Sequence, residues 1–155
     1  MIKINGILLD KISRQAKSSS RSRMNHNFHQ SADDRMHRML NAIEPGSYIQ
    51  PHKHENPAKR EAFFVLRGKI AVVEFNDEGE IIDHIILDEH NENHGTEVAA
   101  GTWHMIISLE KGSVAYEIKD GPWDPETDKE FAKWAPPEGH SSAAAYLEHI
   151  IRKLH

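Results

Sequence analysis

The sequence contains no cysteine. This absence excludes disulfide bonds, thiolate metal sites and cysteine nucleophiles, and it fits a reducing compartment such as the cytosol. Long hydrophobic runs are absent too, because no stretch approaches the ~20 apolar residues of a membrane-spanning helix. The N-terminal apolar patch ends at Asp10 and is shorter than the core of a secretory signal peptide. We therefore expect a cytoplasmic protein without a membrane partner.

Charge of one sign is not concentrated in any part of the chain. The formal net charge is -5 with histidine neutral, and acidic and basic side chains are dispersed along the sequence. No basic block indicates binding to nucleic acid or to an anionic membrane surface. We therefore expect no nucleic-acid partner. The motifs described below indicate a small molecule as the partner instead.

A chain of 155 residues is most simply one domain. It shows no internal repeat, no low-complexity segment and no linker that would separate two domains. Apolar residues recur at helical spacing near both ends of the chain, which predicts an amphipathic helix at each end. We expect an N-terminal helix within residues 1–22, a β-barrel within residues 23–120 and a C-terminal helical extension over residues 121–155.

Short runs of β-branched or alternating apolar residues fill the region between residues 62 and 118. Turn signals separate these runs, for example at Asn76-Asp-Glu-Gly79 and Lys111-Gly112. Strands this short and this closely spaced are typical of an antiparallel barrel or a double-sheet sandwich. The sequence therefore predicts a mainly β fold.

A row of polar side chains precedes this region. Four of them share one parity of the sequence: Arg23, Asn25, Asn27 and His29. If the segment is a strand, they lie on one face, because side chains alternate along a strand. Two interpretations remain open, an ordinary polar surface strand or the wall of a binding site. In the second case these side chains would contact substrate hydroxyls or a phosphate, and His29 would relay a proton.

Potential metal ligands are spread over two stretches of the chain: His52, His54, Glu61 and His104. Residues two apart on a strand point to the same face, roughly 6.5–7 Å apart, so His52 and His54 could hold one ion together. The hydrophobic run after Glu61 would return a second strand beside them. Three imidazoles and one carboxylate suit one divalent transition metal ion, such as zinc, iron, manganese or nickel. The ordinary alternative is that the histidines are exposed loop residues and that Glu61 is a solvated charge.

Two residues before the histidines share their parity in the sequence, Tyr48 and Gln50. If His52 and His54 face the interior of a barrel, Tyr48 and Gln50 on the same strand face it too. Gln50 would then contact substrate, and Tyr48 would be a second candidate for proton relay. The interior would hold the ligands at one end and apolar side chains deeper down, as expected of a small barrel with a metal beside an apolar pocket.

The spacing of the ligand residues resembles the two sequence motifs of the cupin superfamily. The stretches that carry the resemblance are Gly46-x5-His52-x-His54-x6-Glu61-x6-Gly68 and Ala99-x-Gly101-x-x-His104. The resemblance implies a double-stranded β-helix, or jelly-roll barrel, in which the four residues above are metal ligands. The gap between His54 and Glu61 is longer than in the usual motif, so Glu55 is an alternative carboxylate ligand.

A wider set of stretches is similar to the WbuC family of cupin-fold metalloproteins. They are Arg23-Met-Asn-His-Asn-Phe-His-Gln30, Leu40-Asn-Ala-Ile-Glu-Pro-Gly46, Tyr48-Ile-Gln-Pro-His-Lys-His54, Gly121-Pro-Trp and Trp134-Ala-Pro. Members of this family are often associated with gene clusters for bacterial surface polysaccharides, and cupins commonly pair through exposed sheets. The resemblance therefore implies a polysaccharide-related role and a homodimer, with the strand at residues 23–29 and the terminal helices as candidate contacts.

Three functions are compatible with such a site. The first is an enzyme that acts on a small carbohydrate-like substrate, with the metal as a Lewis acid in an isomerisation or epimerisation. The second is an iron-dependent dioxygenase, because the same ligand set suits iron(II). The third is a non-catalytic module that binds a small molecule. We expect the first, by analogy with the polysaccharide association.

Overall fold

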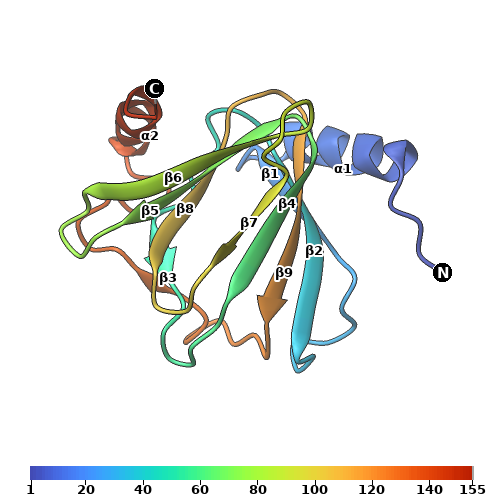
Figure 1. The fold of residues 1–155 in the computed structure, drawn as a ribbon, viewed down its shortest axis with the longest axis horizontal. Helices are drawn as coiled ribbons and strands as arrows, with labels where there is room; N and C mark the ends of the chain where they lie inside the picture. Colours follow the sequence, from blue (N-terminus) through green and yellow to red (C-terminus); the bar gives the residue numbers. More distant parts are fainter. Residues whose placement is uncertain (155) are drawn as a thin grey trace.

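Two antiparallel sheets face each other in the computed structural model, which describes residues 1–154 (Figure 1). The first sheet contains, in spatial order, β1 (Arg23–Asn27), β2 (Met36–Ile43), β9 (Ser113–Asp120), β4 (Glu61–Arg67) and β7 (Gly95–Val98). The second sheet contains β10 (Glu130–Phe131), β3 (His52–Lys53), β8 (Trp103–Ser108), β5 (Lys69–Phe75) and β6 (Ile81–Asp88). His155, the last residue of the expected C-terminal extension, lies outside the described residues.

The strand pairing has the nested pattern of a rolled hairpin. Strand β2 pairs with β9, β3 with β8, β4 with β7 and β5 with β6, all in antiparallel fashion. The pairs β4–β9 and β5–β8 then join these ladders into the two sheets. The chain therefore crosses repeatedly from one sheet to the other, as in jelly-roll folds. The predicted mainly β jelly roll of cupin type, with a helix towards each end of the chain, is confirmed.

The barrel interior is apolar because side chains alternate along each strand. Ile70 and Val72 of β5 belong to an apolar cluster between the sheets, together with Phe63 of β4. Their neighbours Ala71 and Val73 belong to a second cluster on the outer face of the second sheet. Both sets are almost fully buried. The outer face must therefore be covered by another element, since an uncovered sheet face would carry polar side chains.

Helix α2 (Ala143–Arg152) provides this cover for the second sheet. Its buried face presents Leu147 and Ile150, and Leu154 follows just after the helix. These side chains pack on the outward-pointing apolar residues of β5 and β8. The helix agrees with the one predicted near the C-terminus, whereas the first part of the expected helical extension contains no helix.

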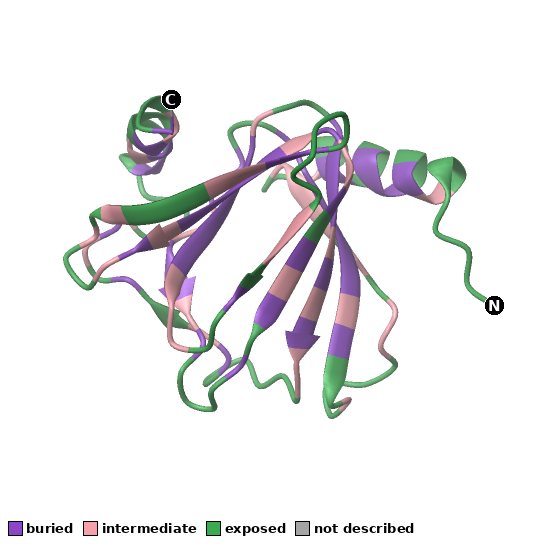
Figure 2. Cartoon of the chain, in the orientation of Figure 1, coloured by how far each residue is buried: buried purple, intermediate pink, exposed green. Residues whose placement is uncertain are grey.

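Helix α1 (Gly6–Ser18) covers the outer face of the first sheet. Asn5 caps the helix, because its side chain accepts a hydrogen bond from the backbone N–H of Leu8 at 3.1 Å. Ile12 on the buried face packs in one apolar cluster with Leu40 of β2. Figure 2 shows buried and exposed residues alternating along this helix. Neither helix in residues 1–154 is long and apolar enough to cross a membrane.

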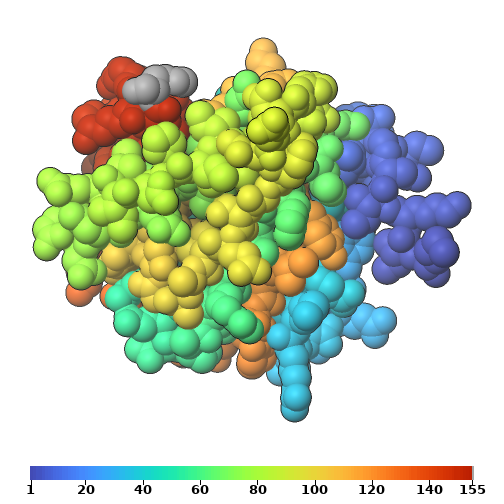
Figure 3. All heavy atoms as spheres, viewed as in Figure 1, coloured from blue at the N-terminus to red at the C-terminus, as the bar shows by residue number. Residues whose placement is uncertain are grey.

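The chain between β9 and α2, residues 121–142, runs past one end of the barrel and is called the strap below. Within the strap, β10 pairs with β3, and the backbone N–H of Ala132 donates to the carbonyl of Pro51 at 2.9 Å. On the side of the molecule seen in Figure 1, side chains fill the space between the two ribbon layers (Figure 3). The strap therefore brings non-helical residues next to β3, which contains the predicted metal ligand His52 and is directly followed by His54.

Candidate metal centre

Four side chains that could hold a metal ion converge in the structure: His52, His54, Glu61 and His104. Their ligand atoms lie within 4.8 Å of one another, and all four side chains are buried. His52 of β3 and His104 of β8 are direct cross-strand partners in the second sheet. Glu61 begins β4 in the first sheet. The cluster therefore combines ligands from both sheets.

The backbone fixes the tautomer of each imidazole in the cluster. In all three histidines Nδ1 faces a backbone carbonyl oxygen, which can only accept a hydrogen bond. The carbonyls are those of Gln50 for His52 at 3.0 Å, Thr102 for His104 at 2.9 Å, and Asp128 for His54. Nδ1 must therefore carry the proton, and Nε2 keeps a lone pair for a ligand.

The surroundings of Nε2 fit a bound cation. Glu61 Oε1 lies 3.0 Å from His54 Nε2, and Glu61 Oε2 lies 2.8 Å from His104 Nε2. With Nδ1 protonated, each contact brings two lone pairs together unless a positive charge, a proton or a metal ion, lies between them. His54 Nε2 is also buried without a hydrogen-bond partner. Ligand atoms about 2–2.2 Å from one zinc-like ion lie about 3 Å apart, so these separations suit a shared metal.

Burial and hydrogen bonds set the charges in the cluster. Burial alone would raise the pKa of Glu61, but its close contacts with the Nε2 atoms of His104 and His54 hold this pKa well below its ordinary value. Burial, followed by the positive charge of Lys129, lowers the pKa of His52 well below its ordinary value. An ionised carboxylate beside a neutral imidazole is the protonation state that metal binding requires.

A buried charge network supports the cluster from the strap. The Asp128 carboxylate lies 2.6 Å from the ammonium of Lys59 and 2.7 Å from that of Lys119, and all three residues are buried. The Lys119 ammonium is also 3.8 Å from Glu61 Oε1. The backbone carbonyl of the same Asp128 accepts the Nδ1–H of His54. These contacts fix the residue that orients His54, as the outer partners of metal ligands do.

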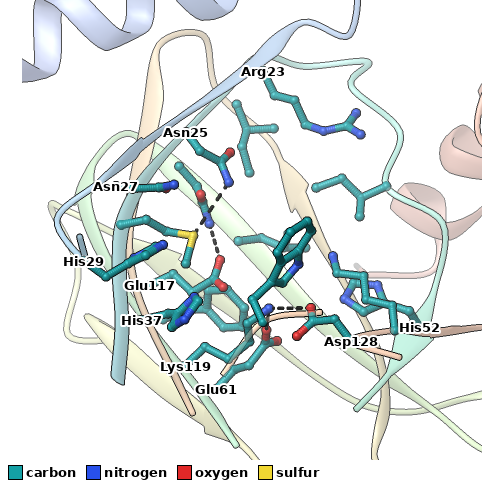
Figure 4. A pocket seen from close by; sticks show the side chains of 18 of the residues that line it. Arg23, Asn25, Asn27, His29, His37, His52, Glu61, Glu117, Lys119 and Asp128 are labelled. Atoms are coloured by element: carbon teal, nitrogen blue, oxygen red, sulfur yellow. Dashed lines mark hydrogen bonds and ion pairs between the residues drawn. The ribbon is translucent and has the colours of Figure 1, made fainter. Parts of the chain in front are cut away.

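The cluster opens into a cavity of about 580 Å3 (Figure 4). His52, Glu61 and His104 form part of its wall. Another part is formed by the predicted polar row on β1 and the residues after it: Arg23, Asn25, Asn27 and His29. Of the two interpretations of this row, its position favours the wall of a site. That these residues bind substrate stays a prediction.

The two ends of the polar row are anchored by other residues. The Arg23 guanidinium donates to the carbonyl of Tyr48 at 3.1 Å and lies 2.6 Å from Glu138 Oε2. The ring of His29 stacks on the ring of His37, with centroids 4.0 Å apart. The wall is therefore held from both the strap and β2.

Tyr48 and Gln50 do not line the cavity, so the expectation that they face the site is wrong. The Tyr48 hydroxyl donates to the carbonyl of Pro136 at 2.8 Å, and burial raises the pKa of this hydroxyl above its ordinary range. The Gln50 amide donates to the carbonyl of Ala132 at 2.9 Å. Strand β3 begins only at His52, so the strict alternation of side chains does not extend to Tyr48 and Gln50.

The alternative carboxylate ligand, Glu55, lies outside the cluster. Its carboxylate pairs with the ammonium of Lys53, and its side chain is 49% exposed. The side chain of Glu61 is 4% exposed and contacts two of the histidines. Of the two carboxylates, the structure therefore places Glu61 beside the imidazoles.

Two acidic residues beside the cluster, Asp128 and Glu117, were missed by the sequence reasoning. Glu117 of β9 is buried, lines the cavity and accepts a hydrogen bond from the side-chain amide of Asn41. Burial is the largest of the effects that raise its pKa. The available signal was a charged residue on the same strand parity as Ala115, which lies in the barrel core. Asp128 had no such local signal, because its place depends on the path of the strap.

Three solved structures share this fold over about two thirds of the chain. The capsular polysaccharide assembling protein CapF from Staphylococcus aureus matches with 23% identity and a TM-score of 0.57, over 69% of this chain and 28% of CapF. KdgF from a Halomonas species matches with 18% identity and a TM-score of 0.50, over 67% of this chain and 82% of KdgF. A protein from Shewanella oneidensis matches with 15% identity and a TM-score of 0.53, over 69% of this chain and 72% of that protein. Likenesses at these identities show the fold alone, and this chain spans less than a third of CapF.

The amino-acid sequence assigns the chain to a family, whereas the structural likenesses show only its fold. A comparison with curated proteins gives no match, and the resemblance to the WbuC family stays a prediction. One family model matches residues 4–87, a stretch that contains α1, the polar row and the ligand candidates His52, His54 and Glu61. Because this match covers more than half of the sequence, the chain belongs to the family described as Domain of unknown function (DUF6016).

Proposed function

We propose that this protein holds one divalent transition metal ion and acts on a small carbohydrate-like substrate in the adjoining cavity. The proposed ligands are His52, His54, Glu61 and His104. The observation that carries the proposal is the arrangement of Nε2 lone pairs around a buried carboxylate, which requires a positive charge among them. The location of the cluster on the wall of a cavity supports a catalytic metal site rather than a closed structural one.

The donor set limits the choice of metal. Three imidazoles and one carboxylate suit zinc, iron, manganese or nickel, and they suit calcium or magnesium less well because those ions prefer oxygen ligands. When bound, such an ion supplies Lewis acidity that polarises a substrate carbonyl. The remaining steps belong to the side chains of the cavity wall.

The cavity wall combines two kinds of surface that a sugar requires. The amides of Asn25 and Asn27 can both donate to and accept from hydroxyl groups. Trp123 and Phe131 of the strap also line the cavity, although they are 44% and 50% exposed. Large aromatic faces left partly in water are suited to the apolar C–H face of a ring whose edge is polar. These features support a carbohydrate-like ligand.

Isomerisation or epimerisation requires groups that take up and return a proton. Glu117 is suited to this role because it is a buried carboxyl group on the cavity wall whose pKa is raised above its ordinary value by burial and by the charge of Glu61. The side-chain amide of Asn41 donates to Glu117 Oε2 and so orients the carboxyl group. His29, the residue predicted from the sequence, is a second candidate at the far end of the polar row. The name of CapF agrees with a carbohydrate substrate, but the proposal depends on the cavity.

Metal content is the first test of the proposed function. The purified protein, analysed for its elements without added metal, is expected to contain about one equivalent of a transition metal, as in a single site with four ligands. The same analysis of Glu61→Gln should show most of the metal lost, because even an outer partner of a ligand typically changes metal affinity by more than about tenfold. Glu55→Gln is the matched control, because it removes a nearby carboxylate outside the cluster. A metal-free wild-type protein that takes up no metal when offered would contradict the proposal.

The chemistry is tested on the metal-loaded protein with a panel of aldoses and ketoses in deuterated water. If the protein catalyses enolisation, we expect deuterium to be incorporated at the carbon next to the carbonyl. NMR measures this incorporation. Glu117→Gln should abolish most of this exchange while the metal content stays unchanged. Oxygen uptake without deuterium exchange would instead indicate the iron-dependent dioxygenase, and tight binding without either reaction would indicate a binding module.

A further inference from the structure

Several charged groups on the cavity wall form ion pairs with one another, whereas within the described part of the chain the ammonium group of Lys129 on the strap does not. The Arg23 guanidinium lies 2.6 Å from the Glu138 carboxylate. The Lys119 ammonium lies 2.7 Å from the Asp128 carboxylate (Figure 4). The ammonium of Lys129 lines the same cavity, yet among residues 1–154 it forms no ion pair with a carboxylate. The carboxylates of Glu138 and Asp128 are thus paired with other cations. The carboxyl group of Glu117 on the same wall accepts a hydrogen bond from the side-chain amide of Asn41.

Lys129 is not an ordinary solvated lysine. It is half-buried, directly follows the buried Asp128 and precedes β10, so its backbone position is fixed by the pairing of β10 with β3. Burial, as the largest effect, lowers the pKa of its ammonium group. Its positive charge is, after burial, the second cause of the lowered pKa of His52 in the ligand cluster. A cation held in this way without a counter-ion costs free energy, which a negatively charged ligand would recover.

The net charge of the metal-loaded cavity also favours a negatively charged ligand. A divalent ion and the Glu61 carboxylate together leave a single positive charge at the ligand cluster. The Asp128 carboxylate carries one negative charge between the two ammonium groups of Lys59 and Lys119, so this network is positive as well. Adding Lys129 leaves an excess of positive charge around a partly enclosed cavity, even if Glu117 on its wall is ionised. Charge interactions in such a space are stronger than in water.

From these observations we infer that the substrate is an anion whose carboxylate or phosphate group pairs with the ammonium of Lys129. The inference rests on the proposed carbohydrate function of the same cavity and narrows its substrate class from neutral sugars to sugar acids or sugar phosphates. Carboxylate and phosphate share the chemistry that Lys129 recognises, a compact oxyanion that accepts charge-assisted hydrogen bonds.

Three probes that share one pyranose ring test this inference. Glucose, glucuronate and glucose 6-phosphate carry a hydroxyl, a carboxylate and a phosphate group on the same side of the molecule. Binding is measured by calorimetric titration of the metal-loaded protein after removal of free metal. At least one anionic probe is expected to bind about tenfold or more tightly than glucose, the usual effect of a hydrogen bond to a charged group. The preferred anion shows whether the natural group is a carboxylate or a phosphate.

Substitutions in the strap test whether Lys129 causes the preference for an anionic probe over glucose. Lys129→Met should reduce the preference for the anion to less than about threefold, whereas Lys129→Arg should retain it because the charge remains. Lys133→Met is the matched control, since Lys133 is an exposed lysine of the same strap that does not line the cavity. The melting temperature of each variant is measured first, and Lys129→Gln replaces the methionine variant if that variant does not fold.

The outcomes separate this inference from the proposed function. Equal binding of the three probes by the wild-type protein, no binding of either anion, or a preference that survives Lys129→Met would each overturn the assignment of an anionic substrate. Metal content is determined on the same samples, so a protein that takes up no metal contradicts the metal-dependent function alone. In that case the same titrations of the metal-free protein still decide whether Lys129 selects an anion.

Discussion

Asp128 contributes to the candidate metal centre through two different atoms. Its carboxylate lies between the buried ammonium groups of Lys59 and Lys119, and its backbone carbonyl accepts the Nδ1–H of His54. Burial would raise the pKa of Asp128, but the charge of Lys119 and the hydrogen bonds of both lysines hold it below its ordinary value. A side-chain substitution tests the carboxylate alone, because the carbonyl remains in place.

Replacement of Asp128 by asparagine should weaken both the fold and the metal site. The variant leaves two buried ammonium groups with too little negative charge, so we expect the free energy of unfolding to fall by about 3–5 kcal/mol. Because the strap then holds the His54 imidazole less firmly, metal affinity should fall by about 10–100-fold. Urea unfolding of the metal-free protein measures the first effect, and competition with a chromogenic chelator measures the second.

An exposed acid on the same strap provides the comparison for this variant. Glu126→Gln removes a carboxylate that forms no ion pair in the described part of the chain, and it should change the free energy of unfolding by less than about 0.5 kcal/mol. If Asp128→Asn unfolds at the same urea concentration as the wild-type protein, the buried network does not stabilise the fold.

At the scale of elements, substitutions in helix α1 test how much its packing on the first sheet stabilises the fold. Ile12 is 1% exposed and packs between the helix and the first sheet, whereas Ile7 on the same helix is 79% exposed. Ile12→Ala should therefore lower the free energy of unfolding by about 2–5 kcal/mol, because it leaves a cavity in a packed cluster. Ile7→Ala should change it by less than about 0.5 kcal/mol.

The metal content of both α1 variants should equal that of the wild-type protein. The cluster around Ile12 lies on the outer face of the first sheet, while the ligand residues lie on the cavity side. Thermal or urea unfolding and elemental analysis of the same preparations check the two expectations together. Loss of metal in the folded Ile12→Ala variant would show that the outer cluster and the ligand cluster are not independent.

The elements that could be predicted from the sequence carry a clear local signal. Residues such as Ile12 and Leu147 recur at helical spacing, and β5 is a short run rich in β-branched residues that is followed by a turn signal. The four ligand candidates were found because their spacing matches two known motifs. Tyr48 was misplaced because the strand was assumed to begin earlier than it does. The approach of Asp128 to His54 depends on tertiary contacts of a segment without a period, which no local pattern encodes.

At the scale of the whole molecule, buried histidine makes stability depend on pH. His37 is buried in β2, and burial is the main cause of a pKa below its ordinary value of 6.5. Below about pH 6.5 the unfolded chain therefore binds a proton that the folded chain resists. The stability that the neutral ring contributes is present above this pH and is lost as the pH falls through the folded pKa.

We expect the urea midpoint of the metal-free protein to fall between about pH 7 and pH 5, with part of the fall due to His37. His37→Gln should show a smaller fall over the same range, although its stability at neutral pH is also lower. The remaining slope belongs to other histidines with lowered pKa values, among them His52. Parallel curves for the wild-type protein and His37→Gln would contradict the contribution assigned to His37.

Metal removal acts on the whole molecule because the proposed ligands join parts that are otherwise far apart in the sequence. His52 and His104 belong to the second sheet, Glu61 to the first, and His54 is held by the strap through Asp128. A metal that binds only the folded chain stabilises it by about 2.7 kcal/mol at a free concentration one hundred times its Kd. For a domain of this size we expect a chelator to lower the melting temperature by about 5–10 °C. His104→Ala should melt at one temperature with and without metal, which separates loss of the ion from other effects of the chelator. If the wild-type protein loses its metal without any change in melting temperature, the ion does not join the two sheets.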